Sequence, residues 1–109
     1  MTAVRHDLEM VRGDTFAFGV RVANLDGAQV TGIWFTIRKV ASEDPIVVQK
    51  RIGDGVTPAV DGYYRVRVAP EDTAEIEAGR YNYDLQIDIG EDVYTPIAGK
   101  IRIAQDVTW

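Results

Sequence analysis

The amino-acid sequence predicts an all-β fold, an antiparallel β-sandwich of about seven strands with one short helical turn near residues 70–78. Three observations lead to this prediction. Apolar and polar residues alternate along most of the chain, Asp-Gly and similar turn sequences separate the alternating stretches, and no long stretch has the spacing of an amphipathic helix. Because 109 residues are enough for one core, we expect a single domain over residues 1–109.

Seven stretches are expected to form the strands in chain order. The first lies near residues 6–11, and a short one lies near 45–52. The other five alternate, and each would bury one face because successive strand side chains point to opposite sides. Their core-facing positions are Phe16, Phe18, Val20 and Val22; Ile33, Phe35 and Ile37; Tyr64, Val66 and Val68; Tyr81, Tyr83, Leu85, Ile87 and Ile89; and Val93, Thr95, Ile97, Ile101 and Ile103.

One segment interrupts the strands and begins at Pro70. Proline suits the first position of a helical turn, and the acidic residues after it suit the positive end of the helix dipole. The turn would end at Gly79, and Tyr81 would open the strongest strand. This spacing resembles the tyrosine corner of immunoglobulin-like sandwiches, in which the tyrosine hydroxyl bonds to backbone a few residues upstream. The expected architecture is therefore immunoglobulin-like, without the cysteine pair of antibody domains.

The last hairpin has a predictable register. Both strands would bury odd-numbered residues, so a three-residue loop over residues 90–92 keeps both core faces inward and a two-residue loop does not. This register pairs Leu85 with Ile97, Tyr81 with Ile101, and Tyr83 with Gly99. The ring of Tyr83 would cover the gap beside Gly99.

The sequence Arg12-Gly13-Asp14 matches the tripeptide by which many extracellular proteins bind integrins. Here it falls between the first two expected strands, with apolar alternation resuming at Phe16. Gly13 can take a positive φ and Asp14 can bond its own turn, so we interpret both as structural turn residues. Adhesion would also require an extracellular setting, and the start of the chain lacks the apolar stretch of a secretory signal.

Composition narrows the classes of partner. The net charge is −5 and the pI is about 4.7, which disfavours nucleic acid and anionic membranes as partners. No apolar run is long enough to span a membrane. Because the chain has no cysteine, it has neither disulfides nor a thiolate zinc site. We expect no cofactor.

The sequence gives little support for a catalytic site. A serine triad would have to use Ser42 and His6, the only serine and histidine, and Ser42 lies in a polar turn. Asp84 and Asp88 share a strand face but lie roughly 13 Å apart, on a solvated face without a cleft. Calcium binding by turn carboxylates lacks an ordered ligand spacing; the candidates are Glu43, Asp44, Asp54 and Asp61. We therefore expect no enzyme activity and no metal.

Exposed aromatic residues are the candidate interface. Successive side chains of a strand alternate between its two faces. Trp34 is therefore expected on the outer face of its strand, and Tyr94 and Pro96 on the outer face of the last strand. These two strands would flank the strand that runs from residue 81 to 89. Together with Tyr63 and Trp109 they are candidates for a protein–protein interface, since large aromatics dominate such contacts. The alternative is that other parts of the monomer cover them.

Several segments carry a family resemblance: Leu8–Phe16, Thr31–Lys39, Pro70–Ala74, Ala78–Gln86, Gly99–Ile103 and Asp106–Thr108. They are similar to the N-terminal immunoglobulin-like domain of phage baseplate upper proteins and to small prophage tail-associated relatives. The resemblance implies a structural module that binds other phage tail or baseplate proteins, here without a following domain, and that is made in the bacterial host cytoplasm. A homo-oligomer is compatible with it.

Two other functions stay open. One is a carbohydrate- or receptor-binding module that uses exposed aromatics as stacking platforms. The other is a cell-wall hydrolase, which the scarcity of nucleophiles and metal ligands disfavours.

Overall fold

The computed structural model describes residues 4–22, 30–39, 45–60 and 62–107. Nearly all of them are β-structure, in agreement with the predicted fold class. The elements in chain order are β1 (Val4–Arg5), β2 (Leu8–Val11), β3 (Phe16–Arg21), β4 (Val30–Arg38), β5 (Ile46–Ile52), β6 (Gly55–Pro58), β7 (Tyr63–Val68), α1 (Pro70–Thr73), β8 (Gly79–Ile89) and β9 (Asp92–Ala104). The sequence did not predict the strands β1 and β6.

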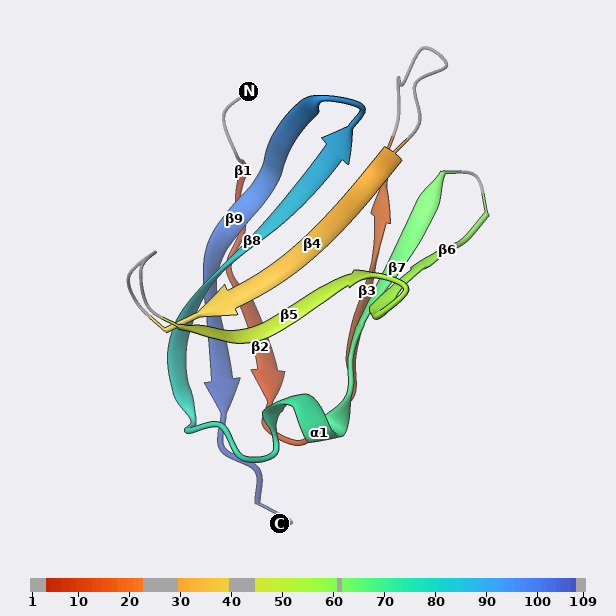
Figure 1. The fold of residues 1–109 in the computed structure, drawn as a ribbon. Coiled ribbons are helices and arrows are strands. Elements are labelled where there is room, and N and C mark those ends of the chain that lie inside the picture. The colour runs from red at the N-terminus through yellow and green to blue at the C-terminus, as the bar shows by residue number, and fades with distance from the viewer. Residues whose placement is uncertain (1–3, 23–29, 40–44, 61, 108–109) are drawn as a thin grey trace.

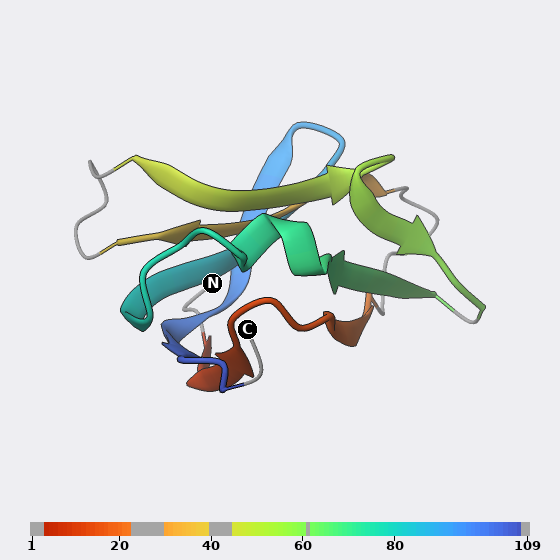
Figure 2. The same cartoon turned by 90° about the horizontal axis from the view of Figure 1, so that it is seen from below.

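The strands form two layers (Figures 1 and 2). In the first layer β8 lies between β9 and β4, β5 follows β4, and β1 and β2 both pair with β9. In the second layer β7 lies between β6 and β3. A two-residue pairing of β5 with β6 joins the layers into one hydrogen-bonded path. The predicted position of the strand from residue 81 to 89, between the Trp34 strand and the last strand, is confirmed.

The core lies between the layers and contains the predicted faces. The ring centroids of Phe18 on β3 and Phe35 on β4 are 5.2 Å apart, and Phe35 lies 5.7 Å from Tyr83 on β8. Aromatic side chains thus connect both layers across the core. Its fully buried apolar residues are Ile33, Phe35, Ile37, Val56, Val66, Val68, Leu85, Ile101 and Ile103.

The tyrosine corner is present. The hydroxyl of Tyr81 donates a hydrogen bond of 2.5 Å to the carbonyl of Glu77, and the residue is 5% exposed. The helical segment before it is shorter than the predicted range, because α1 ends at Thr73 and turns follow. Asp72 holds α1 in place, since its carboxylate accepts the Ala69 N–H at 2.7 Å and lies 2.8 Å from the ammonium of Lys50 on β5.

Gly79, predicted to end the helical turn, instead begins β8 with a φ of 153°. An added Cβ would meet no atom within 4 Å there. The backbone angle, which L side chains rarely adopt, is therefore the structural reason for glycine at this position.

The first strand departs from the antiparallel pattern, because β1 and β2 run parallel to β9. The chain breaks its pairing at His6 and Asp7, where the Asp7 carboxylate accepts the Lys100 N–H at 3.0 Å. A Cβ added to Gly99 would lie 2.5 Å from the carbonyl oxygen of His6. The backbone of His6 therefore fills the space beside Gly99, where the sequence predicted the ring of Tyr83. The hydroxyl of Tyr83 instead donates to that His6 carbonyl.

The last hairpin confirms the predicted register and corrects the loop. Leu85 pairs with Ile97, Tyr81 with Ile101, and Tyr83 with Gly99. The loop itself has two residues, because Ile89 pairs with Asp92. A β-bulge reconciles the two observations: Thr95 and Pro96 together oppose Gln86. Proline suits a bulge because it has no N–H to donate to the ladder.

Between the bulge and the loop, the residues of β9 that face the core are even-numbered instead of odd-numbered. Two predicted side-chain directions are therefore wrong. Val93, predicted to face the core, pairs with Asp88 and is 59% exposed. Tyr94, predicted to face solvent, pairs with the buried Ile87 and so lies on the core side of the sheet, half-buried. Tyr94 is therefore removed from the outer face on which the sequence placed it.

Candidate functional site

The Arg-Gly-Asp sequence forms the tight connection between β2 and β3. The N–H of Asp14 donates to the carbonyl of Val11 at 3.1 Å, which closes a four-residue turn. Gly13 has a φ of 81°, which side chains disfavour, and this explains the glycine. Asp14 contributes its backbone N–H to the turn. Gly13 is therefore a structural turn residue, as predicted, whereas the bond shown for Asp14 does not depend on its side chain.

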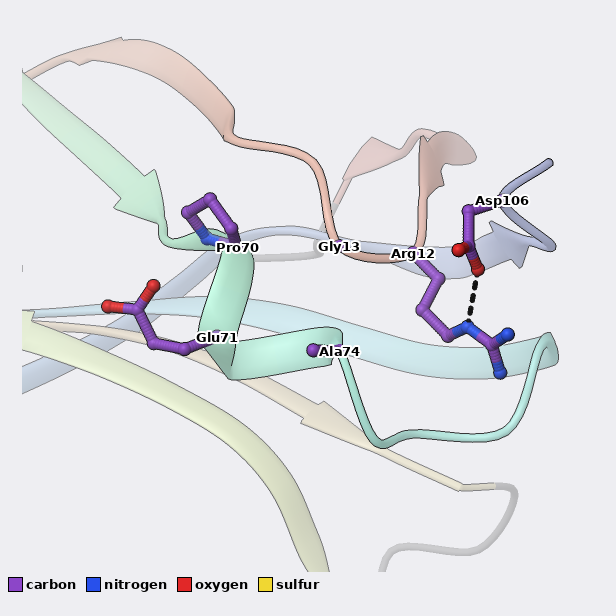
Figure 3. A pocket seen from close by; sticks show the side chains of 6 residues that line it. All are labelled: Arg12, Gly13, Pro70, Glu71, Ala74 and Asp106. Atoms are coloured by element: carbon purple, nitrogen blue, oxygen red, sulfur yellow. Dashed lines mark hydrogen bonds and ion pairs between the residues drawn. The ribbon is translucent and has the colours of Figure 1, made fainter. Parts of the chain in front are cut away.

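Contacts from Arg12 and Gly13 tie this turn to two distant segments (Figure 3). The Arg12 guanidinium bonds to the Asp106 carboxylate at 2.8 Å and to the carbonyl of Ile76 at 3.2 Å. The N–H of Gly13 donates to the hydroxyl of the fully buried Thr73 at 2.9 Å. The pocket of about 360 Å³ beside α1 is thus bounded by residues that join the first turn, the helix and the C-terminal segment. With its guanidinium bound in this way, Arg12 is poorly suited to an adhesion partner.

Trp34 lies on the outer face of β4, as predicted, and is half-buried. Its cross-strand partners are Gln86 on β8 and Arg51 on β5. The indole occupies the space above Gly32, where an added Cβ would collide with the ring. Beside it is a depression of about 270 Å³, whose other lining residues are Thr36, Arg38, Gln49, Asp84 and Gln86. The depression combines one aromatic ring with five polar side chains.

Tyr63 lies on the outer face of the other layer. It is 44% exposed, and the guanidinium carbon of Arg21 is 6.0 Å from its ring centroid, within reach of a cation–π contact. It lines an open depression of about 470 Å³ together with Ala17, Phe18, Gly19, Ala59, Val60, Tyr64 and Arg65. Val60 there is 77% exposed. Val60 could not be singled out from the sequence, because an isolated apolar residue in a connection carries no periodic signal.

The predicted interface residues therefore do not form one surface. Trp34 and Tyr63 lie on the outer faces of different layers, and Tyr94 is turned to the core side. Pro96 lies in the bulge and is half-buried. Trp109 lies outside the described residues. The structure thus replaces one aromatic interface with two separate surfaces, one apolar and one polar.

No group of three or more potential metal ligands occurs among the described residues. Within the same residues, no helix has the length and apolar character needed to cross a lipid bilayer. His6 lies at the break between β1 and β2, with its backbone carbonyl bound by Tyr83. Ser42, Glu43, Asp44 and Asp61, considered above for catalysis or calcium, lie outside the described residues. Asp54 lies 3.9 Å from the ammonium of Lys50.

No family model matches the chain, and no curated protein matches it in sequence. Among solved structures it is similar to part of an endo-β-1,4-mannanase from Thermotoga petrophila, with 12% identity and a TM-score of 0.62 over 91% of this chain and 18% of that one. A putative glycoside hydrolase from Bacteroides vulgatus gives 16% identity and a TM-score of 0.54 over 93% of this chain and 17% of that one. The chain spans less than a fifth of each.

The chain is also similar to murine CRIg, with 9% identity and a TM-score of 0.51 over 93% of this chain and 92% of that one. At such identities these likenesses show the fold alone. The fold is an immunoglobulin-like β-sandwich.

Proposed function

We propose that the protein is a non-catalytic structural component of a phage or prophage tail or baseplate, and that it assembles with other tail proteins through the outer face of β3 and β7. The observation that carries the assembly role is the exposed apolar surface at Val60 and Tyr63. Exposed apolar surface beside an open strand edge favours protein contact over hydration.

The neighbouring strand makes this surface suitable for close approach. The outward residues Ala17 and Gly19 of β3 are small and leave an open depression beside Tyr63, which Arg65 also lines. Among the described residues β3 pairs with β7 alone, which leaves its other edge open. From Phe16 to Val20 the strand has no charge or proline, the usual devices that protect an edge from pairing. A partner strand or side chain can therefore reach both the edge and the apolar face.

The tail setting rests on the sequence resemblance described above. The net charge of −5 suits a protein partner better than a nucleic acid. A homo-oligomer formed through the same face is compatible with this proposal, because Val60 and Tyr63 would offer the same exposed apolar surface on each copy.

Coexpression with each protein encoded beside its gene, followed by size-exclusion chromatography with light scattering, tests the proposal. We expect a complex with a tail protein, and we expect Val60→Asp to weaken it by at least about tenfold, since a carboxylate would lose its hydration in place of an apolar contact. The matched control is Val93→Asp, an exposed valine at the hairpin end that should leave the complex intact.

Two outcomes would count against the proposal. If neither the neighbouring proteins nor a second copy of this chain binds, the assembly role is wrong. If a complex forms and both valine variants retain it, another surface mediates assembly.

A further inference from the structure

The depression beside Trp34 is a second candidate binding surface, on the layer opposite the proposed assembly face. Three neighbouring strands build it: β4 contributes Trp34, Thr36 and Arg38, and β5 and β8 contribute the remainder. Thr36 has two direct cross-strand partners, Gln49 on one side and Asp84 on the other. Trp34 has Gln86 as its partner on β8. The register therefore forms a polar row across three strands, with the indole at the next position along β4.

The polar side chains offer both donors and acceptors. The Gln49 amide donates to the Thr36 hydroxyl at 3.2 Å, and the Gln86 amide donates to Asp88 at 3.1 Å. A primary amide has a second N–H and a carbonyl oxygen, so each glutamine keeps capacity to bond a ligand. The internal bonds hold these amides in place before a ligand arrives, which reduces the entropy cost of binding.

The charges in the depression balance. Among the described residues that line it, Arg38 and Asp84 are charged, one of each sign. Partial burial raises the pKa of Asp84, and the positive charge of Arg38 opposes this shift with a smaller effect. A lining with no net charge favours neither an anionic nor a cationic ligand, so the complementary ligand is uncharged and rich in hydroxyl groups.

We propose that this depression binds an uncharged carbohydrate chain, with one sugar ring packed on the indole of Trp34 and its hydroxyls bonded to Gln49, Gln86 and Asp84. The weakly positive C–H groups of a sugar ring suit the negative π-face of an indole. Its hydroxyls act both as donors and as acceptors, as the two glutamines require. A volume of about 270 Å³ is slightly below the usual range of small-molecule pockets and suits a short section of a longer chain.

This inference does not depend on the proposed assembly role, because Trp34 and Tyr63 lie on different layers. The two can therefore be tested and can fail separately.

The test uses the full chain labelled with ¹⁵N and three neutral oligosaccharides, mannohexaose, cellohexaose and N-acetylchitohexaose, each titrated alone. Concentrations up to about 10 mM would nearly saturate a site with a Kd of about 1 mM. We expect at least one of them to shift the NMR signals of the Trp34 indole N–H and of the Gln49 and Gln86 side-chain amides. Polygalacturonate, an anionic chain, should bind at least about tenfold more weakly than the best neutral ligand.

Substitutions then assign the site. Trp34→Ala should weaken binding about tenfold, and Gln86→Ala should weaken it about threefold to tenfold. Tyr63→Ala is the matched control, an exposed aromatic on the other layer that should leave the Kd unchanged. Because Trp34 packs on Gly32, the fold of Trp34→Ala is checked by its spectrum, and Gln86→Ala carries the test if that variant unfolds.

Three outcomes would overturn the inference: no neutral oligosaccharide shifts these signals, the shifts map to another face, or Tyr63→Ala weakens binding as much as Trp34→Ala does. A tail protein that competes for the Trp34 face while no oligosaccharide binds there would identify the depression as a protein interface instead.

Discussion

Arg12 and Asp106, which are 94 residues apart in the chain, are joined by a hydrogen bond of 2.8 Å between the guanidinium Nε and a carboxylate oxygen. The side chains are 25% and 5% exposed, respectively. This ion pair connects the turn after β2 with the segment after β9. It is a shielded contact, unlike most surface ion pairs.

Loss of this contact should destabilise the protein. We expect Arg12→Ala to lower the free energy of unfolding by about 2 kcal/mol, because it removes charged hydrogen bonds to Asp106 and to the Ile76 carbonyl. Urea unfolding measures the difference. The control is Arg5→Ala, whose 3.6 Å pair with Asp7 is largely exposed and should contribute less than about 0.5 kcal/mol. Equal losses in the two variants would contradict the structural role of Arg12.

The same contact leads to a prediction about cell adhesion. Because the Arg12 guanidinium is bound within the protein, we expect integrin-bearing cells to attach no better to surfaces coated with the wild type than to surfaces coated with Asp14→Glu. Attachment that is seen with the wild type and lost in Asp14→Glu would show that the tripeptide is functional.

The tyrosine corner should have a measurable effect on stability. We expect Tyr81→Phe to lower the free energy of unfolding by about 1 kcal/mol, since it removes the hydrogen bond to the Glu77 carbonyl without removing the ring. Tyr63→Phe, at an exposed ring, is the comparison and should change stability little. If Tyr81→Phe unfolds at the same urea concentration as the wild type, the bond does not stabilise the corner.

Close packing at Gly99 makes this position intolerant of a side chain. We expect Gly99→Ala to cost about 1–3 kcal/mol, because its Cβ would lie 2.5 Å from the His6 carbonyl oxygen. Hydrogen exchange of the His6 amide, which bonds to Ala98, should also accelerate. At Gly19 the added Cβ would lie 3.6 Å from the Tyr63 ring, so Gly19→Ala should be nearly neutral. Similar behaviour of the two variants would rule out the clash.

The carboxylate of Asp84 should make the stability of the protein depend on pH. Burial raises the pKa of Asp84, and the nearby Arg38 only partly offsets this increase. The folded state therefore binds the carboxyl proton more tightly than the unfolded state does. The ionised form therefore costs stability at pH 7, and the cost disappears as the pH falls through this pKa toward 3.8. Asp84→Asn should be more stable than the wild type at pH 7, by less than about 0.5 kcal/mol because the group is exposed, and equal to it near pH 3.5. Melting temperatures at both pH values measure this. A gain that grows on acidification would have the wrong sign.

Much of the fold could be predicted because alternation fixes which face of a strand is buried. Ile33, Phe35 and Ile37 are all fully buried, as their spacing predicts. The register of the last hairpin followed from the same parity. The loop did not, because a three-residue loop and a two-residue loop with a bulge both keep residues 97 to 103 in phase. Pro96 was the signal that could have distinguished them, since proline is rare in a regular central strand.

The candidate sites were less accessible to sequence analysis. Alternation places Thr36 and Gln86 on outward faces, but it cannot show that Gln49 lies opposite Thr36. That adjacency depends on strand order and pairing. The open edge of β3 likewise depends on which strands pair with it. The alternation of residues along a strand predicts which face each side chain lies on. Which side chains lie next to it depends on the order and pairing of the strands.

The parallel pairing of the first and last strands also sets the polarity of the domain. Since β1 and β2 run in the same direction as β9, the described chain begins toward one end of the sandwich, and β9 finishes at the other (Figure 1). The longest dimension is 46 Å. Modules joined before β1 and after β9 would therefore be held toward opposite ends of the sandwich.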